Sequence, residues 1–164
     1  QYEHPGTHVP AKNCNLRDLW DILHVYVAPS RVEFAGEGLF ARRSIKKGSL
    51  VAVFNGARKR QFRQEFGSEE SSDYCIKVNA TISLDIPVFY IPVKQYSATL
   101  AHKACHSFSP NSKFNKFEHP RFGKIMAIFA KEDIEKDDEI FVSYGYKMLY
   151  APEWYRNLWL QYLR

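Results

Sequence analysis

The feature that most constrains the fold of this sequence is the recurrence of turn signals between short apolar runs. Lys47-Gly48 and Asn55-Gly56 each close such a run, and His119-Pro120 separates two more. Runs of this length are typical of strands. The strands we expect cover residues 24–28, 38–44, 49–54, 73–78, 81–85, 113–117, 123–130 and 139–144. Many short strands with few helices predict a mainly β, or α+β, domain.

Three segments have helical character. Asn15 can cap a short helix over residues 16–23. Residues 94–104 form a second candidate, with Tyr96, Leu100 and His102 near one side. The third runs over residues 152–163, because Pro152 suits a first helical turn and aromatic and leucine side chains then recur every four residues. Residues 58–72 are polar, and we expect a loop or an irregular helix there.

Length, charge and cysteine content narrow the class of protein. The 164 residues fit one domain, and the net charge of +5 is dispersed, which favours general surface charge over nucleic-acid binding. Three cysteines without a Cys-x-x-Cys pair indicate neither a disulfide framework nor a zinc site. The apolar runs are too short to span a membrane. Because residue 1 is Gln and no signal peptide is visible, we expect an intracellular fragment of a longer chain.

Two charged stretches allow a functional interpretation beside a plain one. Acidic residues gather between Glu65 and Asp73, where they form either a solvated loop or a docking surface for a basic peptide. Basic and aromatic residues alternate over residues 113–124, which suits single-stranded nucleic acid, although we favour an ordinary strand with one face in the core.

Four segments carry the chemistry by their order and spacing. They read AGEGLFAR over residues 35–42, VFNGAR over 53–58, LAHKACHSFSPN over 100–111 and SYGY over 143–146. Each alone has a plain explanation, such as a glycine turn or the end of a strand. Together they resemble the SET-domain methyltransferases, which carry a glycine-rich turn, then a histidine followed by Pro-Asn, and finally a tyrosine at a strand end.

The resemblance extends from about Val25 to Leu163. His119-Pro120-Arg121-Phe122-Gly123 and Ala151-Pro152-Glu153-Trp154-Tyr155 make the chain similar to the branch that carries MORN repeats before the SET domain and monomethylates histone H3 and other nuclear proteins. It implies a flanking segment over residues 1–24, a SET domain over 25–150 and a cofactor-covering helix over 151–164. The implied fold has several small sheets, knot-like threading of the middle and late motifs, and a C-terminal helix.

The resemblance also implies a function. The cofactor would be S-adenosylmethionine, and the substrate would be a lysine of another protein, such as a histone tail. The protein would be a monomer in the nucleus, with the cytoplasm as a second location, and would have no metal and no nucleic-acid or membrane partner. Transfer of a methyl group from the sulfonium to the lysine amine is a direct displacement. Its rate depends on orientation and a dry channel, so neither a metal nor a covalent nucleophile is required.

The site residues follow from the same resemblance. Tyr144 would orient the reacting groups, and Tyr146 would act with it and line the lysine channel. The residues assigned to the cofactor are Ala35, Gly36, Glu37, Lys103, Cys105, His106 and Trp154. Of these, Ala35 to Glu37 and His106 would act through their backbone, Lys103 would sit near the carboxylate, and Trp154 would stack on the adenine.

Three residues depart from the family pattern. Cys105 stands in place of an asparagine that binds the methionine end of the cofactor, and a thiol is a weaker partner. Phe54 and Phe114 stand in place of channel tyrosines. Because the phenylalanines still build an apolar tunnel and Tyr144 and His106 are intact, we favour an active enzyme with relaxed product specificity, giving dimethyl- or trimethyllysine. The alternative is an impaired SET module that serves as a protein-binding or scaffold domain.

Overall fold

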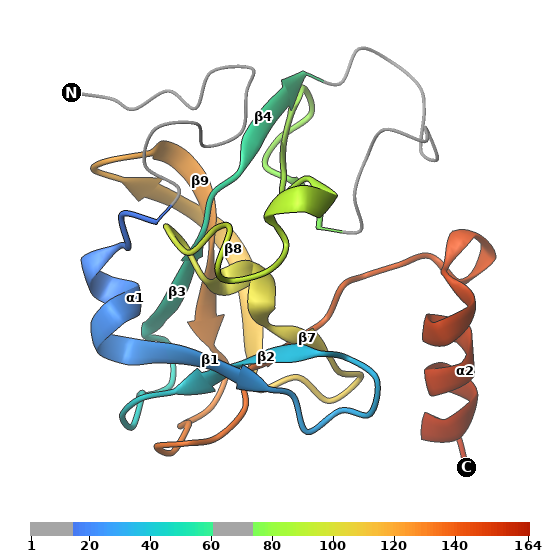
Figure 1. The fold of residues 1–164 in the computed structure, drawn as a ribbon. Helices are drawn as coiled ribbons and strands as arrows, with labels where there is room; N and C mark the ends of the chain where they lie inside the picture. Colours follow the sequence, from blue (N-terminus) through green and yellow to red (C-terminus); the bar gives the residue numbers. More distant parts are fainter. Residues whose placement is uncertain (1–14, 61–73) are drawn as a thin grey trace.

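The computed structural model describes residues 15–60 and 74–164 as four small sheets and a few short helices (Figure 1). The strands are β1 (Val25–Pro29), β2 (Glu37–Ala41), β3 (Leu50–Phe54), β4 (Ala57–Arg60), β5 (Ile76–Lys77), β6 (Ile82–Asp85), β7 (Cys105–His106), β8 (Ser112–His119), β9 (Gly123–Ala130) and β10 (Phe141–Val142). The helices are α1 (Leu19–His24) and α2 (Glu153–Tyr162), with 3-10 turns η1 (Val88–Tyr90), η2 (Ala101–Lys103) and η3 (Met148–Tyr150). The predicted β-rich fold with a C-terminal helix is confirmed.

The central sheet has the order β3-β9-β8, and all its pairs are antiparallel. β8 and β9 form the predicted hairpin, in which His119 pairs with Gly123. Much of β3 and β9 is fully buried, since apolar β-branched side chains suit a strand covered on both faces. Side chains of β3 and β9 form a large part of the hydrophobic core.

Two further sheets pack around the central one. β1 pairs with β2 as a hairpin, and β6 pairs with both β4 and β5. The predicted hairpin through Asn79 is confirmed, because Asn79 Oδ1 accepts hydrogen bonds from the backbone of Thr81 and Ile82. The interpretation of residues 58–72 as loop or helix is wrong at its start, where β4 pairs with β6; the rest lies outside the described residues.

The predicted helix over residues 94–104 is wrong except for the single turn η2. Residues 96–106 are almost all buried, so their polar groups must find partners in neighbouring elements. Leu100 donates its backbone N–H to the Asp21 carboxylate, and the carbonyl of Ala98 accepts from the backbone of Asp18. These tertiary contacts replace the helical ladder.

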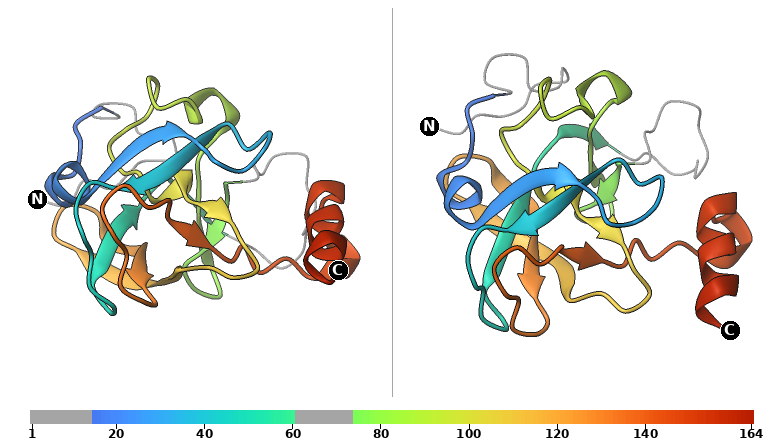
Figure 2. Two further views of the ribbon diagram at one scale, coloured as in Figure 1. Left: turned by 90° about the horizontal axis from the view of Figure 1, so that it is seen from below. Right: turned by 60° about the horizontal axis from the view of Figure 1, so that its bottom comes forward.

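Two strands, β2 and β10, are shorter than predicted. β2 ends at Ala41 instead of residue 44, and β10 covers two of the residues predicted over 139–144. β10 runs parallel to β7, so the middle and late motifs lie side by side. The ribbon of α2 lies to one side of the sheets and is joined to them by the chain segment after β10 (Figures 1 and 2).

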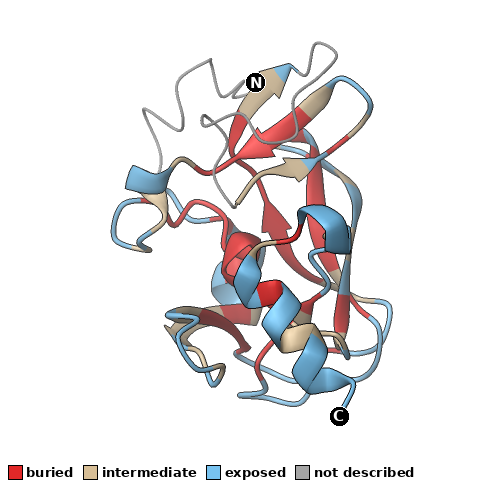
Figure 3. Ribbon diagram, turned by 90° about the vertical axis from the view of Figure 1, so that its right-hand side faces the viewer, coloured by how far each residue is buried: buried red, intermediate tan, exposed pale blue. Residues whose placement is uncertain are grey.

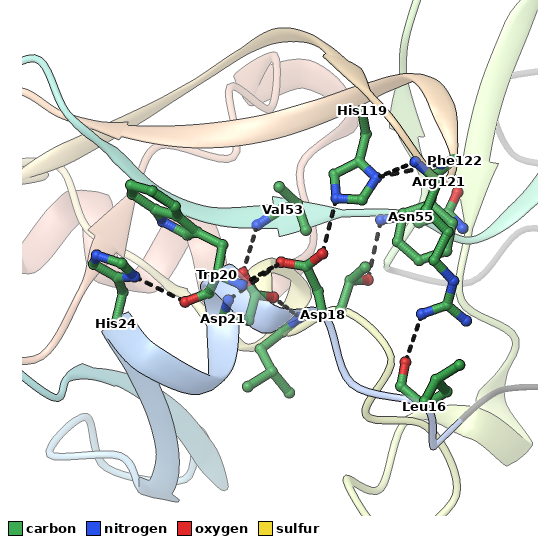
Figure 4. A network of polar contacts seen from close by, with 12 residues as sticks. Leu16, Asp18, Trp20, Asp21, His24, Val53, Asn55, His119, Arg121 and Phe122 are labelled. Atoms are coloured by element: carbon green, nitrogen blue, oxygen red, sulfur yellow. Dashed lines mark hydrogen bonds and ion pairs between the residues drawn. The ribbon is translucent and has the colours of Figure 1, made fainter.

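The first helix begins later than predicted, and its cap is Asp18 instead of Asn15. Asp18 Oδ1 accepts from the backbone of Trp20 and Asp21, while Oδ2 lies 2.8 Å from Nε2 of His119 (Figure 4). The buried Asp21 accepts from the backbone of Val53 and Leu100, so α1 is tied to β3 and to the segment before η2. Residues 15–24, predicted as a flanking segment, therefore hold the domain's central sheet.

The pKa values of the two carboxyl groups in this network shift in opposite directions. Burial raises the pKa of Asp21 well above its ordinary value. The pKa of Asp18 is lowered, because its hydrogen bonds to His119 and to backbone N–H groups outweigh the effect of burial. The contribution of Asp18 to stability is therefore present above the ordinary carboxyl pKa and is lost as the pH falls through the lowered value.

Asp18→Ala should lower the free energy of unfolding by roughly 2–4 kcal/mol at neutral pH. The helix loses its cap, at about 1 kcal/mol, and the buried His119 ring loses its partner, at about 1–3 kcal/mol. Urea unfolding followed by tryptophan fluorescence measures the change. Glu132→Ala, an exposed acidic residue, is the control and should change stability by less than about 0.5 kcal/mol. Equal stability of the two variants would contradict this role for Asp18.

Candidate functional site

An ion pair joins the first and middle motifs. Lys103 Nζ lies 2.5 Å from the Glu37 carboxylate and also donates to the backbone carbonyl of Ile91. The Lys103 side chain is 3% exposed, whereas that of Glu37 is 39% exposed. A buried ammonium must be paired, so Lys103 fixes Glu37 at the surface. Both residues were assigned to the cofactor site from sequence, and the structure brings them together.

Cys105 lies beside Glu37, the first residue of β2. Its Sγ is 3.5 Å from Ser30 Oγ and 3.7 Å from the carbonyl oxygen of Glu37. Burial raises the pKa of this thiol, with Glu139 adding to the effect. Cys105 is therefore a protonated, weak hydrogen-bond donor and not a thiolate nucleophile.

Glu139 holds the loop before β2 by hydrogen bonds, although its sequence context gave no signal for this role. The buried carboxylate accepts from the hydroxyl of Ser30 at 2.6 Å and from the backbone of Arg31 at 2.9 Å. A Cβ at Gly38 would lie 2.5 Å from Glu139 Oε1. The second glycine of the first motif is thus required for close approach of this carboxylate, and it keeps the loop before β2 in place.

Tyr144 is held at both ends. Its hydroxyl donates to the carbonyl of Ala104 at 2.9 Å, and its backbone N–H donates to Nδ1 of His106 at 3.1 Å. His106 therefore accepts at Nδ1 and carries its proton on Nε2, a buried atom without a partner among the described residues. Burial lowers the pKa of His106, so the ring is neutral. The geometry brings the predicted residues His106 and Tyr144 into direct contact.

The C-terminal helix reaches the body through aromatic rings. Most of the α2 ribbon is exposed (Figure 3). Tyr155 is its one buried residue, and the ring centroid of Tyr155 lies 4.6 Å from that of His106. Phe108 packs against Trp159 at 4.9 Å. Trp154, predicted to cover the cofactor, is 41% exposed and contacts His106 and Tyr144. The predicted wide apolar face of this helix is packed only in part, because Tyr155 is buried whereas Trp154, Tyr162 and Leu163 are exposed.

The two channel phenylalanines form a separate cluster. Phe54 and Phe114 lie 6.0 Å apart, edge to face, and Phe54 also contacts His102 at 6.2 Å. Tyr144 and Tyr146 instead contact each other and the rings of His106, Trp154 and Tyr155. The rings assigned to one channel therefore form two groups, and their union in a channel stays a prediction.

His102 was not assigned a role from sequence. Its ring is 3% exposed and packs beside Phe54, Tyr74 and Tyr96. Neither ring nitrogen has a hydrogen-bond partner among the described residues. Burial lowers its pKa to about 3. A neutral histidine thus stands directly behind the candidate channel.

The remaining assignments give less. Ala35 is exposed in the turn before β2, where its backbone donates to Val32, and Gly36 accepts from Ser30. The acidic stretch from Glu65 to Asp73 lies outside the described residues. In the described ranges, 15–60 and 74–164, no group of three acidic, histidine or cysteine side chains is placed to hold a metal. No helix there is long and apolar enough to cross a membrane.

Comparison with known proteins identifies the family. The SET domain model matches residues 36–145, so the chain belongs to the SET-domain family. Among curated relatives, a histone-lysine N-methyltransferase, SETD7 of Halocynthia roretzi, is 34% identical over 141 residues, which is 81% of this chain and 36% of that protein. A variant-silencing SET domain-containing protein of Plasmodium falciparum (isolate 3D7) is 32% identical over 130 residues, or 73% of this chain and 5% of that protein.

A solved structure is similar as well. The crystal structure of a candidate histone methyltransferase from Plasmodium falciparum aligns with a TM-score of 0.51 and 22% identity, covering 77% of this chain and 96% of that one. This likeness shows the SET fold. The chain spans little more than a third of the first curated relative and a small part of the second, so activity and substrate are proposals.

The buried His102 should make the protein sensitive to mild acid. The unfolded chain takes up a proton near pH 6.5, but the folded ring stays neutral down to about pH 3. Stability therefore falls as the pH drops below 6.5, by up to about 1.4 kcal/mol per pH unit. Between pH 7 and pH 5, wild type should lose about 2 kcal/mol more than His102→Gln in urea unfolding. Parallel losses in the two proteins would show that His102 is not held neutral.

Proposed function

We propose that this chain is the catalytic domain of a protein-lysine methyltransferase that uses S-adenosylmethionine. The observation that carries the proposal is the convergence of three SET motifs, in which Glu37 contacts Lys103 and Cys105 while Tyr144 contacts Ala104 and His106. Membership of the SET family and the likeness to a histone-lysine methyltransferase support it.

The residues present fit this cofactor. Glu37 offers a half-exposed carboxylate for an ammonium, and the buried Lys103 beside it offers a cation for a carboxylate. Trp154 presents a partly exposed indole suited to stacking on adenine. When bound, S-adenosylmethionine supplies an electrophilic methyl group on a sulfonium.

The protein contributes orientation and exclusion of water. The Tyr144 hydroxyl donates to the backbone carbonyl of Ala104, and this bond fixes the position of its oxygen for polar contacts with the reacting groups. Apolar rings at Phe54 and Phe114 favour the neutral form of a substrate amine, because a desolvated site lowers an amine's pKa. We propose Tyr146 as a further wall of the lysine channel.

The substrate is a lysine of another protein. A basic tail that carries this lysine, such as a histone tail, is suited by its charge to the acidic stretch of residues 65–73. A nuclear location, with the cytoplasm as a second one, and action as a monomer complete the proposal. The alternative is a SET module that binds proteins without catalysis; the specific observation in its favour is the replacement of three polar site residues by Cys105, Phe54 and Phe114.

Titration calorimetry with S-adenosylmethionine and S-adenosylhomocysteine tests the cofactor site. We expect one-to-one binding by wild type and about fivefold tighter binding by Cys105→Asn, because an amide makes a stronger hydrogen bond than a thiol, by about 1 kcal/mol. Cys75→Asn, at a half-buried cysteine just before β5, is the control. No binding at millimolar ligand would support the scaffold alternative, and an unchanged dissociation constant in Cys105→Asn would place Cys105 away from the cofactor.

Product specificity tests the channel. Phe114→Tyr adds a hydroxyl that can hold the amine or a water and leaves less room, so mass spectrometry of methylated basic peptides should show a shift toward monomethyllysine. Phe117→Tyr, the same change three residues along β8, should leave the products unchanged. Identical product distributions in wild type and Phe114→Tyr would remove Phe114 from the channel.

A further inference from the structure

The first strand of the domain has a free edge. Among the described residues β1 pairs with β2 alone, and the backbone N–H of Ser30, just after β1, donates to the carbonyl of Gly36. Hydrogen-bonded residues alternate along an antiparallel pair, so Val25, Val27 and Pro29 direct their backbone groups away from β2. A proline in this place is typical of an edge strand, because it has no N–H to donate.

Val27 is the open position on this edge. The N–H of Val25 donates to the carbonyl of Asp21, and the carbonyl of Val25 accepts from Nε of Arg42 at 3.4 Å. Within residues 15–60 and 74–164, the outward N–H and carbonyl of Val27 have no hydrogen-bond partner. An unpaired donor and acceptor on a sheet edge favour the addition of another extended segment.

A hollow of about 200 Å³ lies along the same edge. Val25, Tyr26 and Val27 line it, so it meets side chains from both faces of β1. Ile22 of α1 and Leu100 add to its apolar lining. An apolar cavity of ~150 Å³ can hold a benzene molecule, so this hollow has room for one branched or aromatic side chain of an added segment.

Two arginines give the hollow a positive charge. Arg17 and Arg42 line it, and no acidic side chain of the described residues does so. Neither guanidinium takes part in an ion pair within the described part of the chain. Asp18 and Asp21, the acidic residues nearest in sequence to this surface, are buried and bonded within the domain. The charge of the hollow is therefore available to a ligand of opposite sign.

Arg42 is already oriented for such a ligand. Its Nε donates to the Val25 carbonyl, and its guanidinium carbon lies 5.5 Å from the centre of the Tyr26 ring. The two terminal nitrogens have no hydrogen-bond partner among the described residues. A guanidinium held in place by such contacts loses little entropy when it binds a carboxylate, and its planar fork matches the two carboxylate oxygens.

We infer that the free edge of β1 and this hollow bind an extended acidic segment of a partner protein. Val27 pairs with the backbone of the segment, one apolar side chain of the segment enters the hollow, and acidic side chains reach Arg17 and Arg42. Two cations beside an apolar wall suit an acidic peptide better than a nucleic acid, whose affinity depends on several phosphate contacts.

This binding surface is separate from the proposed reaction. None of the residues assigned to the cofactor or to the lysine channel lines the hollow. α1, which contributes Ile22, lies on the opposite side of the molecule from α2 (Figures 1 and 2). Binding of the acidic segment therefore requires neither S-adenosylmethionine nor methyl transfer.

Fluorescence anisotropy with labelled short peptides tests the surface. The probe alternates glutamate with valine. One control peptide has glutamine in place of glutamate, and the other is methylated at its backbone nitrogens. Wild type should bind the probe about tenfold tighter than either control, because the first lacks the charge and the second cannot pair as a strand.

Two variants and a matched control locate the binding. Arg42→Glu should weaken binding of the probe by about tenfold or more, and Val27→Pro should also weaken it, because it removes the outward N–H and leaves the pairing with β2 intact. Arg43→Glu makes the same charge change at an exposed residue outside the hollow. At physiological ionic strength it should change the dissociation constant by less than about threefold. Circular dichroism verifies that each variant is folded.

No binding of the probe at millimolar peptide, equal binding of the probe and the glutamine peptide, or equal affinity of wild type and Arg42→Glu would overturn the inference. If sedimentation shows a wild-type dimer that Val27→Pro abolishes, the edge takes a second copy of this chain, and the assignment to a partner protein is wrong. It is also wrong if oligodeoxythymidine binds in an Arg42-dependent manner and the peptide does not. Failure of methyl transfer would affect the proposed function and not this surface.

Discussion

The site depends on the side chain of Asn111, whose amide makes two hydrogen bonds to the backbone just before β10 and at its start. Asn111 donates from its amide nitrogen to the Glu139 carbonyl and accepts from the backbone of Phe141, both at 2.9 Å. These two bonds reproduce the pairing that a neighbouring backbone would supply, and they lead into the parallel pair of β7 and β10. Because His106 ends β7 and Tyr144 follows β10, Asn111 sets the register that brings the two together. Glu139 then extends the same segment to the loop before β2 through Ser30 and Arg31.

The sequence was most informative where periodicity and turn chemistry agreed. The β8–β9 hairpin and the helix after Pro152 were predictable because one face of each is apolar and a proline marks the boundary. The helix predicted over residues 94–104 was wrong because the backbone of Ala98 and Leu100 bonds to Asp18 and Asp21. These are tertiary contacts, which no local pattern encodes. Asp18 could have been recognised as a cap by residue type, but Asn15 offered an equal signal three residues earlier.

The site was predictable in its residues and not in its grouping. Motif order selected Glu37, Lys103, Cys105, His106 and Tyr144, and the structure joins them by direct contacts. Glu139 and His102 were missed for the same reason: each acts from a buried position, and isolated acidic or histidine residues carry no signal in a sequence. The separation of the two phenylalanines from the two tyrosines is likewise a property of packing alone.

That separation affects how the departures from the family pattern are understood. The lost polar groups at Phe54 and Phe114 fall in a cluster that also contains the neutral His102, whose ring nitrogens have no hydrogen-bond partner among the described residues. The rings at Tyr144, Tyr146 and Trp154 retain both hydroxyls and the indole. The loss of hydroxyl groups at Phe54 and Phe114 therefore leaves the hydrogen bonds of Tyr144 to Ala104 and His106 in place, because these bonds belong to the other group of rings.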